Sequence, residues 1–289
     1  MMNRSKIEWC DYTWNPVTGC LHGCDYCYAR RIAHRFSRGT GKGVNPLAYY
    51  VPDLGIYVGD AENDSLNENT NIYVLKYPMY DEWVVKEGEY NYCYDPFPYG
   101  FEPTFHKYRL DEPKKIKKPA RIFVCSMADL FGDWIPDEWI LEVLKVVEEC
   151  PQHTFFFLTK NPSKYYSFKF PDNAWVGASA VNRPDEKVQY MDDGSFIVTT
   201  AHCIADTMAF LPRSFLSIEP LLNDVAADID FDFIDWVIVG AQTGPGAVPP
   251  KPEWVQKIID ACRAVGVPIF LKNNLKWPEK IQEYPEGLR

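Results

Sequence analysis

The 289-residue chain has no apolar run near the ~20 residues that a membrane-spanning helix needs, although 46% of its residues are hydrophobic. Basic residues are also in deficit: 30 lysines and arginines face 40 aspartates and glutamates, which gives a net charge of −10. Such a chain is unsuited to general nucleic-acid binding, because phosphates attract a basic surface, although a local basic groove is compatible with this balance. The polar start at residues 1–6 does not resemble an apolar targeting segment. We therefore expect a cytoplasmic protein with no membrane partner.

Cysteine is used unevenly along the chain. Six of the nine cysteines are scattered, and four of these lie beside apolar segments or near the ends of expected helices. Isolated cysteines in such places are typical of reduced core thiols in a cytosolic protein. The four expected core thiols are Cys125, Cys150, Cys203 and Cys262.

The other three cysteines stand together as Cys20, Cys24 and Cys27, in the spacing C-x3-C-x2-C. Thiolates this close repel one another and oxidise easily, so their clustering indicates a task. One loop with three thiolates can hold a [4Fe–4S] cluster by three of its irons. The fourth iron is then left for a ligand that is not protein, whereas a cluster that only carries electrons usually takes four cysteines.

This spacing, with Tyr26 before the last cysteine and Tyr28 after it, resembles the radical S-adenosylmethionine (SAM) superfamily. The resemblance implies that SAM binds the open iron through its amino and carboxylate groups, with Tyr26 among the cofactor-binding residues. It also implies that the reduced cluster cleaves SAM to methionine and a 5′-deoxyadenosyl radical, which abstracts hydrogen from a substrate. A reductant such as flavodoxin or ferredoxin would supply the electron.

Residues 28–36 follow a helical pattern, with Ile32 and Phe36 four positions apart and arginines around them. A helix that begins directly after a cluster loop directs its N-terminal dipole at the negatively charged cluster. The arginines are expected to form a solvated helix face, with ligand binding as the alternative.

From residue 120 onward, apolar strands alternate with helices. Near-continuous apolar strands in this rhythm indicate a parallel sheet covered by helices. Together with an aromatic-rich first strand at 7–14, they predict an α/β fold: a full or partial TIM-type (β/α) barrel of about six or seven parallel strands. The expected strands are 121–125, 154–159, 174–179, 213–219, 235–240 and 267–272, and the expected helices are 136–149, 162–166, 201–211 and 252–265.

Residues 39–119 do not follow this rhythm. They are rich in aromatic, acidic and proline residues, with short strand patterns and a polar stretch at 63–71. We expect an inserted β-rich cap on the substrate side, or alternatively a partly disordered decoration. The predicted domain division is therefore a radical SAM-like barrel from 1–38 and 120–289, with the insertion at 39–119.

Charged residues end several of the expected strands, where barrel enzymes place their chemistry. Lys160 and Lys272 directly follow apolar strands and would need an opposite charge, for which Glu219 is the candidate. These three are the candidate catalytic residues. Alternatively, the lysines meet the carboxylate of SAM or an anionic substrate.

A series of motifs also resembles a phage-associated radical SAM family of unassigned reaction. The resemblance to the wider radical SAM superfamily implies that Ser126 and Asp129 lie near the amino group of SAM, and Ser179 and Asn182 near its ribose. The chain departs from the family pattern after two strands, at 240–244 and 272–274. The motifs are Trp14-Asn15-Pro16, Ser126–Phe131, Leu158-Thr159-Lys160, Trp175-Val176-Gly177, Glu219–Leu222 and Asp235–Gly240.

Two classes of function follow. The first is a radical SAM enzyme acting on an unidentified substrate. The phage resemblance, and aromatic residues that could stack on bases, favour a nucleotide or nucleic acid as that substrate, for modification or photoproduct-lyase-like repair.

The second is a structural zinc site in a binding protein, formed by Cys10, Cys20, Cys24 and Cys27, with His22 as a spare ligand. Zinc sites usually use paired CxxC units, and only Cys24 and Cys27 form one. A variant of the first class keeps the cluster but uses SAM only as a structural ligand.

Overall fold

The computed structural model describes residues 2–37, 49–51, 56–58, 72–86, 89–182, 189–190, 197–198 and 200–288. The chain divides into two compact units, and each is described by itself. The predicted insertion at 39–119 falls in unit 1 together with the cysteines of the C-x3-C-x2-C motif, and its boundaries as a separate domain stay a prediction. Unit 1 comprises Met1–Arg4, Tyr12–Lys118 and Val124–Cys150, and unit 2 comprises Ser5–Asp11, Pro119–Phe123 and Pro151–Arg289.

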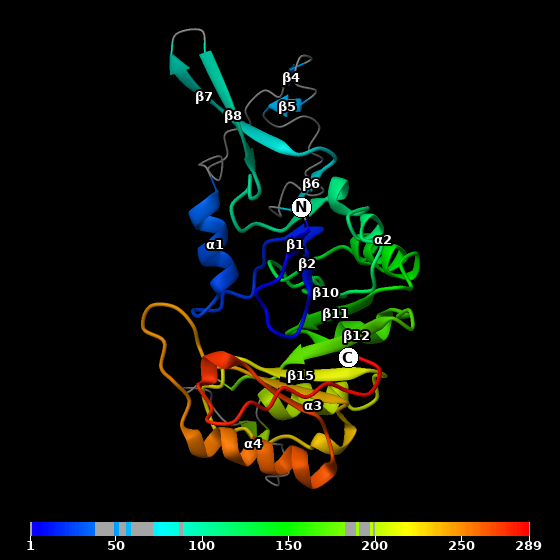
Figure 1. The fold of residues 1–289 in the computed structure, drawn as a ribbon, viewed down its shortest axis with the longest axis vertical. Coiled ribbons are helices and arrows are strands. Elements are labelled where there is room, and N and C mark those ends of the chain that lie inside the picture. The colour runs from blue at the N-terminus through cyan, green and yellow to red at the C-terminus, as the bar shows by residue number, and fades with distance from the viewer. Residues whose placement is uncertain are drawn as a thin grey trace. The chain divides into compact units, whose positions relative to one another are not determined.

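Unit 2 is built on a parallel sheet, drawn mainly in green to red in Figure 1. The strand pairs of this sheet are all parallel, and β12, β15 and β16 are buried along their whole length, as expected for strands covered on both faces. The order of the strands is β10 (Arg121–Val124, of which the first three residues belong to unit 2), β11 (Thr154–Thr159), β12 (Ala174–Ser179), β15 (Ser214–Ile218), β16 (Trp236–Val239) and β17 (Ile269–Leu271).

The predicted α/β class with a large parallel sheet is confirmed, whereas a closed TIM-type barrel is not shown. In the described part of the chain, β17 pairs with β16 and ends the strand order without pairing back to the first strand. A barrel requires that last pairing, because closure is what removes the free sheet edges.

Helix ends in unit 2 follow local rules. Helix α4 (Pro252–Val265) has a proline in its first turn and ends at Gly266, whose φ of +75° is left-handed. The sequence predicts these same bounds. No helix among the described residues is long and apolar enough to cross a membrane. Unit 2 also contains helix α3 (Thr200–Met208) and the 3₁₀ turns η3 (Pro162–Ser167), η4 (Phe231–Phe233) and η5 (Asn273–Leu275). A short antiparallel strand pair is formed by β13 (Gln189–Tyr190) and β14 (Ile197–Val198).

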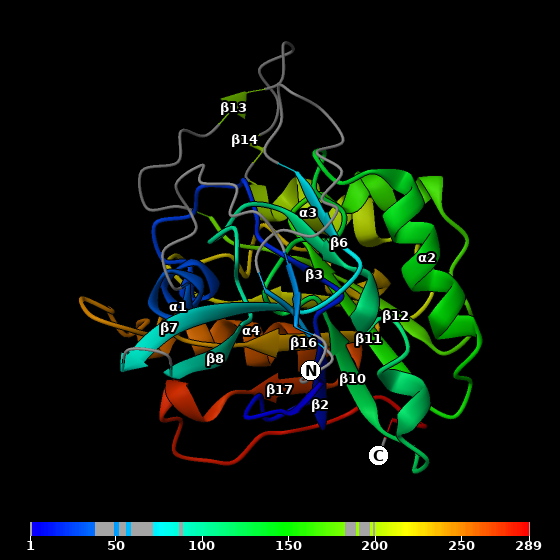
Figure 2. The same cartoon turned by 90° about the horizontal axis from the view of Figure 1, so that it is seen from above.

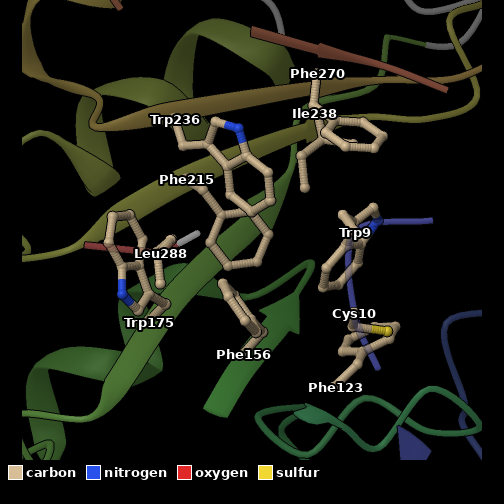
Figure 3. Packing of buried hydrophobic residues seen from close by; sticks show 10 residues of the cluster. All are labelled: Trp9, Cys10, Phe123, Phe156, Trp175, Phe215, Trp236, Ile238, Phe270 and Leu288. Atoms are coloured by element: carbon tan, nitrogen blue, oxygen red, sulfur yellow. The ribbon is translucent and has the colours of Figure 1, made fainter. Parts of the chain in front are cut away.

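An aromatic cluster forms the core of unit 2 (Figure 3). The ring centroid of Trp9 lies 4.9 Å from that of Phe123 and 5.5 Å from that of Phe156. Phe215 needs a glycine beside it, because a Cβ on Gly177 would come within 2.2 Å of the Phe215 ring. The remaining members are Cys10, Trp175, Trp236, Ile238, Phe270 and Leu288.

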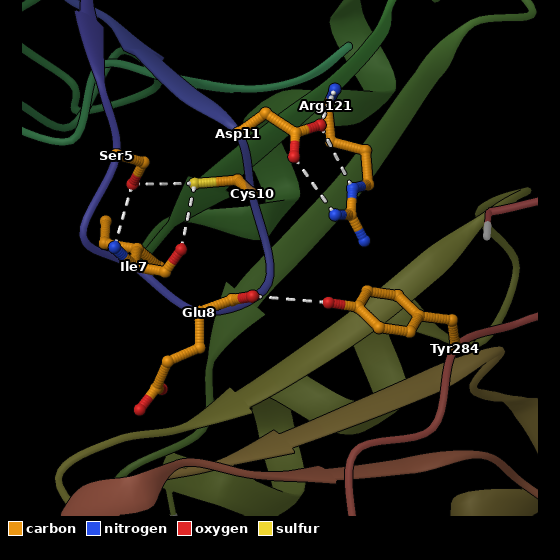
Figure 4. Close-up of polar contacts among 7 residues, drawn as sticks. All are labelled: Ser5, Ile7, Glu8, Cys10, Asp11, Arg121 and Tyr284. Carbon is orange, nitrogen blue, oxygen red and sulfur yellow. Dashed lines mark hydrogen bonds and ion pairs between the residues drawn. The ribbon is translucent and has the colours of Figure 1, made fainter.

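The predicted strand at 7–14 is wrong for its first part. Only β2 (Tyr12–Trp14) is a strand, whereas residues 5–11 form a turn that buries Trp9 in unit 2. Polar contacts hold this turn (Figure 4): Asp11 accepts hydrogen bonds from the backbone N–H of Arg121 at 2.8 Å and from its guanidinium at 3.1 Å. The alternation of aromatic residues in this segment therefore reflects the packing of Trp9 against other rings, and not the alternation of side chains along a β-strand.

The described residues of unit 1 form small sheets and two α-helices. Strand β1 (Asn3–Arg4) pairs antiparallel with β2, and β3 (Val17–Thr18), β9 (Thr104–His106) and β6 (Tyr73–Leu75) form a sheet in that order. The polar stretch expected at 63–71 lies outside the described residues. Figures 1 and 2 both show the long hairpin of β7 (Met79–Lys86) and β8 (Glu89–Asp95) and the helices α1 (Tyr28–Phe36) and α2 (Asp137–Glu148). The remaining elements are the pair β4 (Tyr49–Val51) and β5 (Ile56–Val58) and the 3₁₀ turns η1 (Lys107–Arg109) and η2 (Pro113–Lys115).

Candidate functional site

The cysteine loop, residues 19–27, connects β3 to α1 in unit 1. It leaves the sheet at Gly19, whose φ is +88°. A Cβ on Gly19 would come within 2.2 Å of the carbonyl oxygen of Glu102, so only glycine allows this close approach. The N–H of Gly19 also donates to the carbonyl of Met127 at 2.9 Å. The backbone therefore fixes the loop at its first residue.

The three cysteines of this loop are half-buried free thiols. The N–H of Cys27 donates to the carbonyl of Cys24 at 3.2 Å, and the Cys27 sulfur accepts a hydrogen bond from the N–H of Arg30 at 3.3 Å, which caps α1. On their inner side, the sulfurs of the loop meet an apolar bed. Cys20 and Cys27 pack against this bed, which is formed by Ala29, Ala33, Phe97, Phe101 and Met127.

The surroundings of the thiols favour a bound cation. Burial raises the pKa of Cys20 to about 12, and the negative charges of Asp129, Cys24 and Cys27 raise it further against a lowering hydrogen bond from a backbone N–H. A metal ion replaces the proton and neutralises these charges. Helix α1 begins directly after Cys27 with no acidic residue in its first turn, so its positive end would stabilise an anionic group held by the loop.

A hydrogen bond ties the cysteine loop to the turn after β10. His22 Nε2 lies 2.7 Å from Asp129 Oδ2, with Nε2–H as the donor to the carboxylate. The other carboxylate oxygen accepts the N–H of Phe131 at 3.1 Å. The His22 ring also meets Trp134 edge-on, with centroids 4.8 Å apart. The predicted SAM-binding residue Asp129 is therefore buried, and its carboxylate accepts hydrogen bonds from within the chain. The sequence alone did not indicate that His22 binds Asp129.

Ser126 is placed by the motif residue Asn15. The Oδ1 of Asn15 accepts hydrogen bonds from Ser126 Oγ at 3.2 Å and from the N–H of Met127 at 3.0 Å. The hydroxyl of Tyr28 donates to the Ser126 carbonyl at 2.6 Å, which joins the first residue of α1 to this turn. Tyr26 lies half-buried within the loop. Unit 1 thus gathers six of the predicted site residues: Cys20, Cys24, Cys27, Tyr26, Ser126 and Asp129.

A buried polar network supports this region, and sequence reasoning missed it. His106 Nε2 lies 2.8 Å from the hydroxyl of Thr18, which directly precedes the loop, and burial lowers the pKa of His106 well below its ordinary value. The guanidinium of Arg109 donates to Tyr94 at 2.6 Å and to the carbonyl of Asn15 at 3.0 Å. No local sequence pattern marks these residues, because their partners lie far away along the chain.

The cluster hypothesis and the structural zinc hypothesis place different demands on the geometry of the cysteine loop. In the described part of the chain, no three His, Cys, Asp or Glu side chains are placed to bind one metal ion, as structural zinc requires. A cluster instead takes each thiolate on a separate iron, so the sulfurs do not need to converge on one point.

Cys10, the fourth zinc ligand of the alternative hypothesis, belongs to unit 2 rather than to the unit that carries the cysteine loop. Its thiol donates to Ser5 Oγ at 3.2 Å, and burial raises its pKa to about 11 (Figure 4). It is thus a core thiol, as are Cys125, Cys150 and Cys262, whereas the prediction of a core thiol is wrong for the exposed Cys203.

Unit 2 holds the candidate charged residues at its strand ends. Lys272, directly after β17, donates to Glu219 Oε1 at 2.5 Å directly after β15, so the expected ion pair is present. Between them in the strand order, β16 is followed by Gly240, where a Cβ would come within 2.7 Å of the Glu219 carboxyl carbon. The missing side chain at 240 therefore makes room for the Glu219 carboxylate.

The remaining predicted residues of unit 2 differ in their surroundings. Ser179 is the buried last residue of β12, and Lys160 follows β11 half-buried. Asn182 is buried and donates to Asp228 at 3.0 Å, while its oxygen accepts the N–H of Ala201 at 2.8 Å. The side chain of Asn182 therefore holds the start of α3, a structural task that the ribose assignment did not foresee.

Comparisons with known proteins give a family and a set of distant structural relatives. A family model described as "Protein of unknown function (DUF5131)" matches residues 4–70 and 85–285. Its description assigns no reaction and names no phage. No curated protein matches the chain in sequence.

Solved structures of spore photoproduct lyase resemble this chain at low identity. A variant with bound AdoMet and dinucleoside spore photoproduct has a TM-score of 0.42 at 12% identity, over 90% of this chain and 63% of the other. A complex with dinucleoside spore photoproduct has a TM-score of 0.43 at 11% identity, with the same coverage. A further variant reaches a TM-score of 0.46 at 11% identity, over 94% and 78% of the two chains. The chain thus spans about 63% of the length of the first two.

Proposed function

This chain belongs to the DUF5131 family of proteins of unknown function, and we propose that it is a radical SAM enzyme. The observation that carries the proposal is the cysteine loop, in which three half-buried free thiols directly precede α1 and two of them, Cys20 and Cys27, pack against the apolar bed. Three thiolates leave one iron of a [4Fe–4S] cluster without a protein ligand. That vacancy is what a chelating cosubstrate requires.

The chain's own residues would divide the work as follows. Cys20, Cys24 and Cys27 would hold the cluster, which when bound supplies the electron that cleaves SAM to methionine and a 5′-deoxyadenosyl radical. His22 holds the turn at 126–129 to the cysteine loop, and Asn15 holds the same turn to the segment before β3. By the superfamily resemblance, Ser126 and Asp129 of this turn would bind the amino group of SAM, and Tyr26 would contribute to the same SAM site.

In unit 2, the ion pair of Glu219 and Lys272 would hold or move a proton at the strand ends. Its side chains are largely shielded from water, which strengthens the attraction between the charges. Lys160 is the further candidate there, and Ser179 and Asn182 are the proposed contacts of the SAM ribose. These assignments follow the superfamily resemblance and the strand-end positions.

We propose a nucleotide or nucleic acid as the substrate, for modification or repair, and a flavodoxin- or ferredoxin-like protein as the reductant. The resemblance to a phage-associated family supports the substrate class. The net charge of −10 favours a local contact with the substrate over general binding along nucleic acid.

Anaerobic reconstitution with iron and sulfide, followed by SAM and dithionite, tests the proposal. The protein should turn brown, absorb near ~400 nm, and release 5′-deoxyadenosine, detected by mass spectrometry. Cys24→Ala should lose both the colour and the product, because it removes one of three iron ligands. Cys203→Ala, a change of an exposed cysteine outside the loop, should retain both.

Two results would contradict the assignment. A colourless protein that carries zinc would favour the structural zinc hypothesis, and full 5′-deoxyadenosine release by Cys24→Ala would remove the loop from the chemistry. A brown protein that releases no 5′-deoxyadenosine would instead leave SAM as a structural ligand.

A further inference from the structure

Helix α1 carries an exposed apolar stripe beside the cysteine loop. Tyr28, Ile32 and Phe36 are spaced four residues apart, so they lie on one face of the helix. Their exposed fractions are 43%, 37% and 51%, and Leu21 in the loop itself is 51% exposed. Large apolar side chains that are exposed together, rather than singly, are typical of an interaction surface.

Arginines border this stripe. Arg31 and Arg35 are exposed on α1, one turn apart, and the Arg35 guanidinium lies 5.5 Å from the centre of the Phe36 ring. In a chain of net charge −10, the stretch between Asp25 and Asp53 contains no acidic residue. The basic residues of that stretch are Arg30, Arg31, Arg35, Arg38 and Lys42.

Helix α1 follows directly on the cysteine loop that carries the thiols. The neighbouring face of α1 buries Ala29 and Ala33 in the apolar bed against which Cys20 and Cys27 pack. Cys27 is also the N-cap of α1. A partner seated on the outer face of α1 would therefore approach the cysteine loop from its solvent side, within one helix width of about 10 Å.

We infer that the outer face of α1, formed by Leu21, Tyr28, Arg31, Ile32, Arg35 and Phe36, is the docking surface for an acidic electron-donor protein. The inference rests on the proposed function, because it names the partner of the proposed cluster. One electron passes from a flavin hydroquinone anion to the oxidised cluster, which leaves a neutral flavin semiquinone and a cluster reduced by one electron. No proton is transferred in this step, and no covalent bond forms or breaks.

The chemistry of the surface favours a protein over a nucleic acid. An apolar centre with an arginine border is the usual composition of a protein interface, in which charges steer the partner and apolar groups are buried. Of its four exposed apolar side chains, Leu21 and Ile32 offer no ring for base stacking, which single-stranded nucleic-acid sites use, and only Tyr28 and Phe36 do. Acidic carriers would be attracted to the basic stretch despite the overall negative charge of the chain.

The test compares two reductants of the reconstituted protein with SAM. A purified flavodoxin, reduced to the hydroquinone, is the probe for docking, and dithionite is the small reductant that needs no docking surface. The double variant Arg31→Glu/Arg35→Glu should slow 5′-deoxyadenosine formation with flavodoxin about tenfold or more at low salt. Its rate with dithionite should stay at the wild-type value, which also shows that it folds and holds the cluster.

A matched control makes the same change of charge at another place on unit 1, away from α1. Lys117→Glu/Lys118→Glu alters two exposed lysines of unit 1 outside α1 and should leave both rates unchanged.

Two further variants separate the apolar contribution from the charges. Ile32→Ser, which removes apolar area and changes no charge, should weaken flavodoxin-driven turnover at high and low salt alike. Arg31→Gln/Arg35→Gln should give a smaller loss than charge reversal, and added salt should reduce the difference from wild type.

The possible failures are distinguishable. Absence of 5′-deoxyadenosine from the wild-type protein with dithionite would overturn the proposed function and this inference with it. Normal dithionite turnover, with flavodoxin rates equal in wild type and Arg31→Glu/Arg35→Glu, would overturn the docking surface alone. Unchanged flavodoxin rates with weakened binding of a single-stranded oligonucleotide would assign the face to nucleic acid instead.

Discussion

The contact between His22 and Asp129 shows what single residues contribute to the candidate site. Both residues are placed by elements far apart in the chain, yet their side chains are 2.7 Å apart and shielded from solvent. A buried carboxylate that accepts a hydrogen bond is stable, and one that loses a partner is costly. This contact therefore holds the middle of the cysteine loop to the turn at 126–129.

We predict that His22→Ala lowers the free energy of unfolding by about 1–3 kcal/mol, because Asp129 loses this hydrogen bond. Iron retention after reconstitution should fall as well, since the loop is less firmly held. Denaturant unfolding and iron analysis measure the two effects. His22→Gln, which keeps a donor of similar length, is the control and should recover part of both; equal stability of all three proteins would show that the contact contributes nothing.

At the scale of elements, two glycines of the cysteine loop do different work. Gly19 and Gly23 both have positive φ values, +88° and +71°. Only Gly19 is also crowded, since its missing Cβ faces the backbone of Glu102, whereas nothing lies within 4 Å of a Cβ at Gly23. The first glycine therefore sets the path from β3 into the loop, and the second only supplies a turn.

The expected result is that Gly23→Ala costs roughly 1 kcal/mol of stability, the usual penalty for a left-handed alanine. Gly19→Ala should cost clearly more, about 3 kcal/mol or above, because a backbone clash adds to the same penalty. Thermal and urea unfolding of the metal-free proteins measure the difference. Equal losses in the two variants would mean that the segment at Glu102 moves aside freely.

The strand ends of unit 2 follow the same logic. Glu219, Gly240 and Lys272 each come directly after a parallel strand, and neighbouring parallel strands bring their carboxyl ends to one edge. The side chain that Gly240 lacks is the space that the Glu219 carboxylate uses to reach Lys272. Two separate positions in the sequence thus supply the charges of one ion pair, and a third leaves the space for it.

At the scale of the whole molecule, each unit has its own hydrophobic cluster. The aromatic core around Trp9 belongs to unit 2, and the apolar bed beneath the cysteines belongs to unit 1. Metal binding adds free energy only to the structure that must be folded to hold the metal. The two units should therefore respond differently to loss of the cluster.

Amide hydrogen exchange of the reconstituted and the chelated protein measures this. We predict slower exchange with the cluster present in residues 14–37 and 124–131, by about tenfold or more at the loop itself. Exchange in β11, β15 and β16 should be the same in both samples. Equal protection gained across all these segments would show that the two units open as one.

How much the sequence predicts depends on how local each feature is. The bounds of α1 and α4 were predictable, because periodicity, caps and a terminal glycine act within one or two turns. The buried turn at residues 5–11 was not, since Trp9 is held by rings from distant strands. The pairing of His22 with Asp129, separated by 107 positions, has no local pattern at all.

By itself, the sequence determined the α/β rhythm and the thiol spacing on which the proposed chemistry depends, because both are short-range patterns. Only the tertiary structure decided that Asp129 is held by His22, that Asn182 supports α3, and that Glu219 meets Lys272 over Gly240. The physical reason is that these contacts join residues whose distance in space is set by the packing of whole strands and helices. No neighbour along the chain determines such distances.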